Sequence, residues 1–499
     1  MTPLPDNQAN PLATVAVPDT RTGHFTRALG LLDATAVVVG SMIGSGIFIV
    51  SAETARHVGS PFWLLICWLL AGVLTVAAAL CYSELAAMFP HAGGQYVFLR
   101  EAYGRLAGFL YGWTLFMVIQ SGTIAAVGVA FAKFLGVFVP SVSNGNVLAQ
   151  VGGWKFSTVQ LIAIIVIVFL TALNCRGIHT ARFIQTTFTV TKVAALAGLI
   201  ALGVLAFDKF NGLAPNLAHF WRAQDLADHT LSGFPLLAVL GLAMVGALFS
   251  CDAWNNITFA GEEVKDAERT LPRSLALGTA LVALLYVLTN VVYLLLLPLH
   301  GVKDGATLLE RGIQFAAEDR VGTAAAQIIF GDAGAGIMAA AIMISTFGCL
   351  NGLILAGPRA YYAMARDGLF FKSAGILHPA VNVPVAGLVL QGVWAALLAT
   401  SGTYSNLLEY VVFAALFFYV LTVGAVFVLR KKQPNLNRPY KVPAYPALPA
   451  LYIVLALAIM LGQICLAPKY TGAGLLIILS GLPAYLFWRA KTKTTEGAE

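Results

Sequence analysis

Charge is what this chain has least of. Asp, Glu, Lys and Arg together make up 11% of its 499 residues, while 59% are hydrophobic. A soluble domain carries roughly 25% charged residues, and a nucleic-acid-binding protein would need a basic soluble module. The long apolar runs leave no segment of useful size for either. The composition therefore predicts an all-α polytopic membrane protein embedded in the lipid bilayer, with no nucleic-acid partner.

Cysteine and histidine are also scarce, and their placement excludes two further classes of protein. The six cysteines all lie in or at the ends of apolar segments, which predicts free thiols and no disulfide framework. The eight histidines fall in the loops or tails between those segments. We therefore expect no metal site and no cofactor.

We also expect no cleavable signal peptide, because no short apolar core with a cleavage site precedes the first long apolar segment. Residues 1–28 are polar and contain four prolines, which favours a mobile tail.

What the chain does have is a series of apolar windows near 20 residues long, the length at which a helix crosses a bilayer. Twelve such windows predict twelve transmembrane helices, at residues 29–52, 62–88, 105–134, 157–174, 183–205, 233–262, 274–298, 333–362, 384–400, 404–429, 447–466 and 472–489.

Lys and Arg are distributed unevenly between alternate loops, and this asymmetry predicts the orientation. With both termini in the cytoplasm, the inside segments carry 20 of the 30 basic residues and the outside loops carry 9. The strongest inside marker runs from Arg430 to Lys441. We expect a multi-pass protein of the cell inner (plasma) membrane with both termini cytoplasmic.

The first predicted helix contains an interruption, Gly40-Ser-Met-Ile-Gly-Ser-Gly-Ile-Phe48. Three glycines and two serines within nine residues disfavour a continuous helix. Close helix packing at Gly44 and Gly46 is the alternative explanation. Because an unpaired backbone amide is costly in hydrocarbon, a break there persists only where protein, water or a ligand pairs with it. The pattern predicts a broken helix that serves as a site.

A second interruption, Leu248 to Asn255, lies in the sixth predicted helix. The second break lies five spans after the first. Because five is an odd number, the second half of the chain has the opposite orientation in the membrane. Paired interruptions of this kind point to a transporter built from inverted repeats. The predicted organisation is a mobile cytoplasmic tail (1–28), a first five-helix repeat (29–205), an outside loop (206–232), an inverted second five-helix repeat (233–430), a basic cytoplasmic loop (431–446), two trailing helices (447–489) and a cytoplasmic tail (490–499).

The two breaks together offer groups for a zwitterion. Unwinding after Ile43 would create a helix N-terminus from Gly46 to Phe48, whose N–H groups and positive dipole end suit a carboxylate. Carbonyls that end the preceding half-helix, and those near Phe249 and Ser250, suit an ammonium group. The breaks therefore predict a site for an α-amino acid.

Several motifs, in this order and spacing, resemble those of the amino acid–polyamine–organocation superfamily, and within it the L-type amino acid transporters and their bacterial relatives. The resemblance implies five-plus-five inverted repeats with broken helices 1 and 6, followed by two trailing helices. It covers roughly residues 29–430, through the motifs Gly40–Phe48, Phe89–Tyr96, Phe249–Asn255 with Glu262-Glu263, Arg269–Pro272, Leu285–Asn290, Phe347–Asn351 with Arg359, and Ala365–Gly368.

The resemblance also implies roles for single residues of the first break. It places the substrate carboxylate on the backbone of Ser45, Gly46 and Ile47. Gly44 would allow the substrate to approach closely.

For the amine, the resemblance implies the carbonyls of Ile43 and Phe249, with Ser250 as a further candidate. Phe249 resembles the aromatic gate over the site, and Asn255 corresponds to a polar residue that lines the pocket. Tyr286 matches a tyrosine that helps to hold the broken first helix.

Lys192 places a charge inside the fifth predicted helix, which costs about 2.5–3.5 kcal/mol on insertion scales. Snorkelling to the interface is the alternative explanation. In the family that the chain resembles, a lysine here occupies the region of the sodium ion found in sodium-coupled members. Its ammonium would bridge the broken first helix and the eighth helix, at Ser345 or Thr346. This predicts sodium-independent transport.

Asp252 lies in the second break and has two interpretations. Asp pairs well with N–H groups that a broken helix frees, which is a structural role. A carboxylate that couples transport to protons or recognises a cation is the other.

We expect a sodium-independent secondary transporter, an exchanger of neutral L-amino acids that works by alternating access. The alternative is proton-coupled uptake of cationic amino acids or polyamines, with Asp252 as the pocket acid. A non-transporting membrane receptor or an enzyme is a remote alternative, and we expect no catalytic residues. The second outside loop, at about 135–156, contains no cysteine, whereas animal L-type transporters bond there to a single-pass partner. No disulfide-linked heavy chain is therefore expected, and the oligomeric state stays open.

Overall fold

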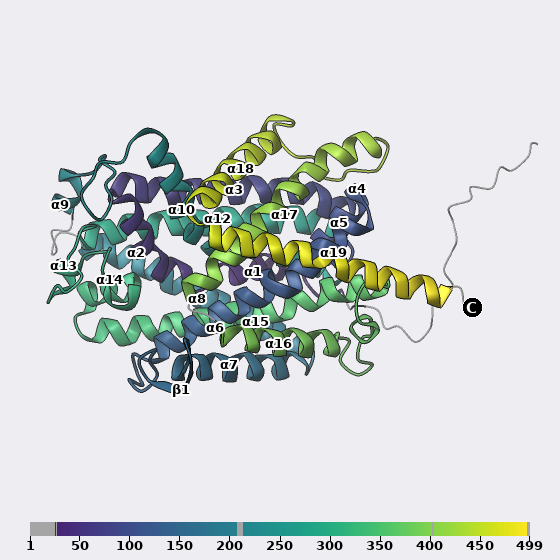
Figure 1. The fold of residues 1–499 in the computed structure, drawn as a ribbon, viewed down its shortest axis with the longest axis horizontal. Helices are drawn as coiled ribbons and strands as arrows, with labels where there is room; N and C mark the ends of the chain where they lie inside the picture. Colours follow the sequence, from purple (N-terminus) through teal and green to yellow (C-terminus); the bar gives the residue numbers. More distant parts are fainter. Residues whose placement is uncertain (1–24, 26, 207–212, 402–403, 497–499) are drawn as a thin grey trace, which may run out of the picture.

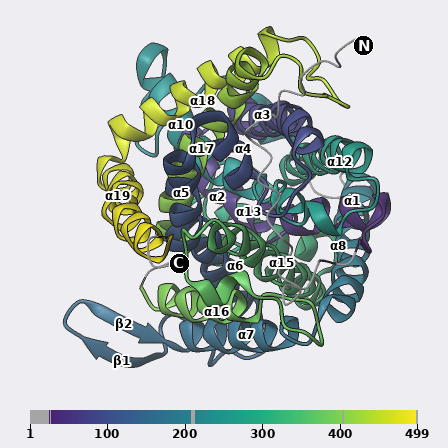
Figure 2. The same cartoon turned by 90° about the vertical axis from the view of Figure 1, so that its right-hand side faces the viewer.

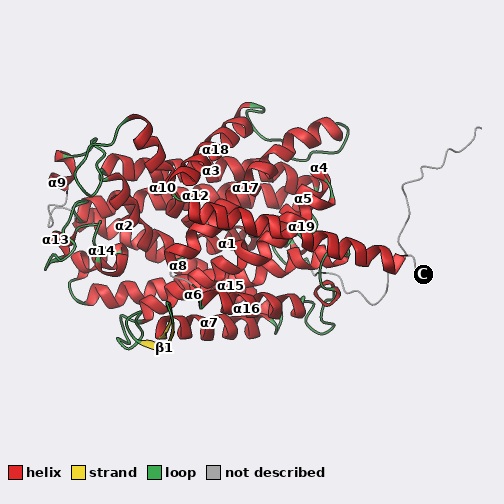
Figure 3. Ribbon diagram, viewed as in Figure 1, coloured by secondary structure: helices red, strands yellow, loops and turns green. Residues whose placement is uncertain are grey.

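The computed structural model describes residue 25 and residues 27–206, 213–401 and 404–496. Most of this part of the chain is helical, with a single short β-hairpin among the described residues (Figure 3). The predicted all-α polytopic membrane protein is thereby confirmed. The predicted tail at residues 1–28 lies mostly outside the described residues.

The α-helices are α1 (Leu31–Met42), α2 (Gly46–Val58), α3 (Pro61–Met88), α4 (Gln95–Tyr103), α5 (Arg105–Thr114), α6 (Gln120–Leu135), α7 (Thr158–Asn174), α8 (Ile178–Ala206), α9 (Leu213–Ala218), α10 (Gly233–Ser250), α11 (Asn256–Phe259), α12 (Ala267–Leu296), α13 (Leu308–Arg311), α14 (Val321–Phe330), α15 (Ala333–Arg366), α16 (Val385–Ala399), α17 (Tyr404–Lys432), α18 (Ala447–Leu466) and α19 (Pro468–Glu496). A π-helix, η1 (Leu115–Ile119), joins α5 to α6, and short 3-10 helices lie at η3 (Gly261–Glu263), η4 (Ala317–Asp319) and η5 (Lys372–Gly375). The hairpin pairs β1 (Val147–Val151) with β2 (Trp154–Ser157).

Within the described residues, nine helices are long and apolar enough to cross a membrane, and ten if the bent pair α1–α2 forms one span. The windows predicted at 157–174 and 384–400 coincide with α7 and α16, which are apolar but have 17 and 15 residues. The exact count of twelve spans therefore stays a prediction.

The long helices lie side by side along the horizontal direction of Figure 1. Segments α9, α13 and α14, which come from loops predicted to be outside, gather at one end of the bundle, while α4 and the end of α19 lie at the other. Figure 2 shows α18 and α19 on the outer side of the bundle. Among the closest packed pairs are α3 with α12, α10 with α2, and α15 with both α6 and α8.

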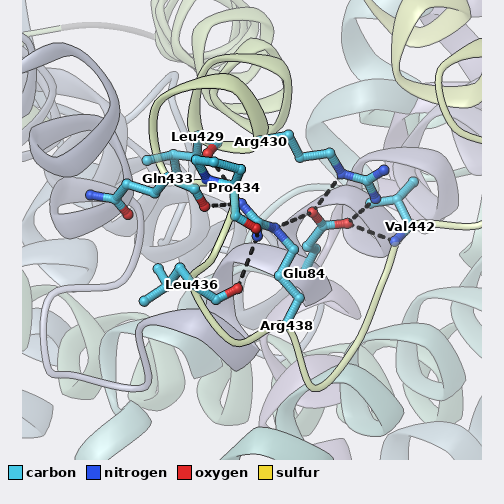
Figure 4. Close-up of polar contacts among 8 residues, drawn as sticks. All are labelled: Glu84, Leu429, Arg430, Gln433, Pro434, Leu436, Arg438 and Val442. Carbon is cyan, nitrogen blue, oxygen red and sulfur yellow. Dashed lines mark hydrogen bonds and ion pairs between the residues drawn. The ribbon is translucent and has the colours of Figure 1, made fainter.

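One buried carboxylate fixes the loop after α17 to the bundle (Figure 4). Glu84, near the end of α3, accepts hydrogen bonds from Arg430 at 2.9 and 2.6 Å and from the Val442 backbone N–H at 2.7 Å. Arg438 lies 3.6 Å from the same carboxylate and donates to carbonyls of the loop itself. The predicted basic loop at 431–446 is thus held against the bundle by an acid of α3.

Candidate functional site

The first predicted helix is broken where the glycines and serines predict it. Helix α1 ends at Met42, Ile43 is extended with φ −75° and ψ 93°, and α2 begins at Gly46 after the N-cap Ser45. The two halves are bent by 41°. The break exposes carbonyls at the end of α1 and directs the amide end of α2 into the same space.

Side chains from three other helices hold the carbonyls of this break. Tyr286 of α12 donates its hydroxyl to the Met42 carbonyl at 3.0 Å, as its predicted supporting role requires. The thiol of Cys349, in α15, lies 3.0 Å from the Ser41 carbonyl oxygen. A break inside a membrane needs such partners because no water is available there to pair with its backbone groups.

Lys192 of α8 is 1% exposed, and its ammonium reaches the break. Its Nζ donates to the Gly40 carbonyl at 2.7 Å and to the Ile43 carbonyl at 2.8 Å. The side chain therefore does not snorkel to an interface. A buried charge is tolerated when oriented carbonyl dipoles replace its hydration shell, as they do here.

The eighth predicted helix, α15, contributes Ser345 and not Thr346 to the hydrogen bonds at the break. Ser345 Oγ donates to the Ile43 carbonyl at 3.1 Å and lies 3.4 Å from the Gly44 carbonyl oxygen. Thr346 instead donates to the Ile342 carbonyl of its own helix at 2.9 Å. The Ile43 carbonyl thus accepts from both Lys192 and Ser345.

The two breaks touch each other at Gly46 and Ser250. A Cβ placed on Gly46 would lie 2.1 Å from Ser250 Oγ and 2.8 Å from Ser250 Cβ, closer than real atoms approach. Helices α2 and α10, which carry these residues, are among the most closely packed pairs of the molecule. The predicted carboxylate end and the predicted amine end of the site therefore lie side by side.

The second break follows Ser250, the last residue of α10, and helix resumes at Asn256. Phe249 lies in the final turn of α10 with 7% of its surface exposed, and its carbonyl accepts from the Asp252 N–H at 3.1 Å. Ala253 adopts φ +65°, a conformation that costs about 1 kcal/mol or more for a residue with a side chain. The chain turns sharply here instead of continuing as helix.

Asn255 faces a short chain of amide and hydroxyl groups. Its Nδ2 donates to Gln95 Oε1 at 3.0 Å, and Gln95 Nε2 donates to Thr422 Oγ1 at 2.9 Å. Gln95 begins α4, in a segment predicted to be a loop, and Thr422 belongs to α17. These two hydrogen bonds link the second break to α4 and α17, and reasoning from the sequence missed both Gln95 and Thr422 as partners.

Asp252 points across to α17, where Tyr419 donates its hydroxyl to the carboxylate. Tyr419 also packs against Trp254, with ring centroids 5.5 Å apart, and both rings contact Tyr82 of α3. Sequence reasoning missed Tyr419, which is one of three tyrosines in the tenth window and carries no signal that separates it from the others.

A buried ion pair joins α15 to the segment that follows the second break. Arg359 of α15 donates to Glu263 of η3 at 2.8 Å, and the two side chains are 1% and 2% exposed. The Glu263 carbonyl accepts from the N–H groups of Ala28 and Leu29, both at 2.9 Å. Glu263 thus binds the start of the described chain and α15 together just beyond the second break.

The family model described as "Amino acid permease" matches residues 29–482 of the chain. The chain belongs to the amino acid permease family. It is a membrane-embedded amino acid transporter of the amino acid–polyamine–organocation superfamily and not an enzyme, and the recognised resemblance to L-type transporters is confirmed.

Three relatives of this permease illustrate the similarity. The serine/threonine exchanger SteT of Bacillus subtilis is 30% identical over 468 residues, which cover 93% of this chain and 98% of the relative. The human large neutral amino acids transporter small subunit 2 is 28% identical over 475 residues, covering 94% and 82%. The human Asc-type amino acid transporter 1 is 29% identical over 483 residues, covering 94% and 84%.

Proposed function

We propose that this permease is a sodium-independent exchanger of neutral L-amino acids that works by alternating access. The observation that carries the proposal is the buried Lys192 ammonium, which donates to the Gly40 and Ile43 carbonyls. A fixed ammonium takes the place in which a bound cation would otherwise stabilise the end of α1. Of the relatives named above, SteT is a serine/threonine exchanger and the other two are amino acid transporters, which supports the same class of activity.

In this proposal, the substrate carboxylate binds the amides of Ser45, Gly46 and Ile47 at the start of α2, with Gly44 giving room. The helix dipole and the free amide geometry at a helix N-terminus favour a carboxylate.

The substrate amine then lies against the carbonyls of Phe249 and Ser250. The Ile43 carbonyl is a weaker candidate for the amine than the sequence predicts, because it already accepts from Lys192 and Ser345. Asn255 and its partner Gln95 line the pocket beyond this point.

The larger architecture of the proposal is the pair of five-helix inverted repeats, 29–205 and 233–430, with two trailing helices. The two observed breaks, one in the first and one in the sixth window, support it. We also propose that both termini are cytoplasmic and that the chain needs no disulfide-linked partner, since residues 135–156 lack cysteine.

Sodium independence is tested with purified protein in liposomes. Counterflow of a labelled neutral amino acid should proceed at equal initial rates in sodium and in choline buffers of equal ionic strength. Liposomes without protein measure leakage, and a strict requirement for sodium would disprove the proposal.

Proton-coupled uptake of cationic amino acids or polyamines is a second candidate, favoured by the partly buried Asp252 in the second break. The two candidates differ in their response to external pH. A pH profile that flattens in Asp252→Asn, together with competition by lysine or putrescine, would favour the second; an unchanged profile and no competition would remove it.

A further inference from the structure

The second break carries a carboxylate that the backbone site for the zwitterion does not use. Asp252 is partly buried, and its carboxylate accepts hydrogen bonds from the Tyr419 hydroxyl and from the Ala253 backbone N–H. An ionised carboxylate only accepts hydrogen bonds and offers about four lone-pair positions. The Tyr419 hydroxyl and the Ala253 N–H therefore leave about half of these positions unmet, in surroundings where an unsatisfied charge is costly.

Two cavities share Asp252 and Tyr419 in their linings. No Lys, Arg or His is among the described residues that line either cavity. The carboxylate therefore faces space without a basic side chain in the walls. The first cavity is mostly apolar, with Leu74, Leu248, Val412, Leu416 and Tyr452 among its lining residues; the second is rich in polar side chains, namely Gln95, Gln120, Thr123, Asn255 and Asn256.

Most polar groups of the second cavity already have partners. Asn255 and Gln95 bond to each other at 3.0 Å, and Gln120 donates to the Leu353 carbonyl at 2.8 Å. Asn256 is the exception among these amides, since it is 1% exposed and its Nδ2 has no hydrogen-bond partner. The cavity therefore contains one acceptor with spare capacity and one buried donor that is unpaired.

We propose that this second cavity receives the side chain of the transported amino acid and selects a hydroxyl group on it. A hydroxyl both donates and accepts, so it can donate to Asp252 and accept from Asn256. An ammonium group only donates and would leave Asn256 unpaired, while a methyl group would leave both unpaired.

The inference rests on the proposed function, because it extends from the backbone end of a bound amino acid. Asp252 follows Phe249, the proposed amine site in the last turn of α10, by three residues, and Asn255, the proposed pocket residue, lines this cavity together with Asp252. The side chain of an amino acid whose amine is bound there would therefore lie next to this cavity.

Threonine and valine are the matched pair of probes, because they have the same shape and differ by a hydroxyl in place of a methyl. Competition of each against a labelled neutral amino acid is measured in proteoliposomes of the full-length protein. We expect threonine to compete about tenfold or more better than valine. Asp252→Ala should bring the ratio close to one, and Asn256→Ala should lower it as an independent variant.

The control is Thr75→Val, which changes a side chain of the first, apolar cavity and should keep the ratio. Asp252→Asn retains an acceptor without charge and should keep part of the preference. A wild-type ratio near one, or a ratio that survives both Asp252→Ala and Asn256→Ala, overturns the hydroxyl site. If no neutral amino acid drives counterflow in the unmodified protein, the proposed exchange itself fails, which is a different outcome.

Discussion

At the scale of single residues, this site depends on small side chains that allow two backbones to meet. Gly46 has no room for a methyl group, because Ser250 fills the position that its Cβ would take. Gly44 is less restricted, with Cys349 Sγ 3.2 Å from its notional Cβ. The contact between the breaks therefore requires glycine most strictly at position 46.

Gly46→Ala should reduce exchange by at least tenfold, since the added methyl must push α2 and α10 apart at the proposed binding site. Ser250→Gly removes both the hydroxyl and Cβ, so the double variant Gly46→Ala/Ser250→Gly should regain part of the activity. Counterflow rates at equal protein content measure this.

Gly198→Ala is the matched control, because nothing lies within 4 Å of a Cβ at that position of α8. It should leave transport unchanged. Full activity of Gly46→Ala, with the same expression, would refute the proposed contact between substrate and this backbone.

Phe249 is the proposed gate, and a variant that lacks its aromatic ring tests that role. Phe249→Ala should lower exchange strongly while the protein still elutes as a single species, because a lost aromatic ring opens the site without disrupting a long helix. Phe249→Tyr, which keeps the ring, should retain most activity. Wild-type rates in Phe249→Ala would remove the assignment.

At the scale of elements, both breaks could be predicted because glycine and polar residues interrupt apolar runs at two corresponding places. The contact of Lys192 with the first break could also be predicted, since a buried charge in a membrane helix needs a partner. The residue of α15 that joins it there was harder to predict: Ser345 and Thr346 are adjacent, and only the rotation of α15 decides which one reaches the break.

Other features had no adequate signal in the sequence. The π-helix at Leu115–Ile119 shifts the phase of the third predicted helix, so the faces of α5 and α6 cannot be read from one helical wheel. Helix α4 lies in a stretch predicted as a loop, and its Gln95 reaches the second break. The pairing of Arg359 with Glu263 requires two segments that are distant in the sequence to meet.

The loop after α17 provides a prediction at this scale. Glu84→Gln should loosen residues 433–446, because the carboxylate loses its charge, which weakens its bond from the Val442 N–H and its attraction to Arg438 and Arg430. Hydrogen bonds to a charged group are worth about 1.5–3 kcal/mol each. Hydrogen exchange followed by mass spectrometry should show faster exchange in that loop.

Glu101→Gln is the comparison, since its pair with Arg100 is about one-third exposed and contributes little. Exchange in residues 433–446 should stay at the wild-type rate in this variant. Equal protection of the loop in Glu84→Gln and wild type would show that Glu84 does not anchor it.

At the scale of the whole molecule, segments from alternate loops gather at opposite ends of the bundle (Figure 1). The β1–β2 hairpin and the loop after α17 come from loops predicted to lie on opposite sides of the membrane. The proposed orientation therefore assigns the hairpin to the outside and the basic loop to the cytoplasm.

Gly153→Cys in the hairpin and Asn437→Cys in the basic loop both place a thiol at an exposed position. A membrane-impermeant maleimide should label Gly153→Cys in intact cells and Asn437→Cys only after the cells are opened. The background should carry Cys465→Ser and Cys175→Ser, because the other four cysteines are buried. The reverse labelling pattern would invert the proposed topology.

The ammonium of Lys192 has a consequence for the energetics of the transport cycle. A dissociable ion couples its own electrochemical gradient to the transport cycle. A group that is covalently part of the protein can neither cross the membrane with the substrate nor be released on one side. If Lys192 holds the place of such an ion, no ion gradient does work at this position. The steady state would then depend only on the amino acid concentrations on the two sides, and the same protein would run in either direction as their ratio changes.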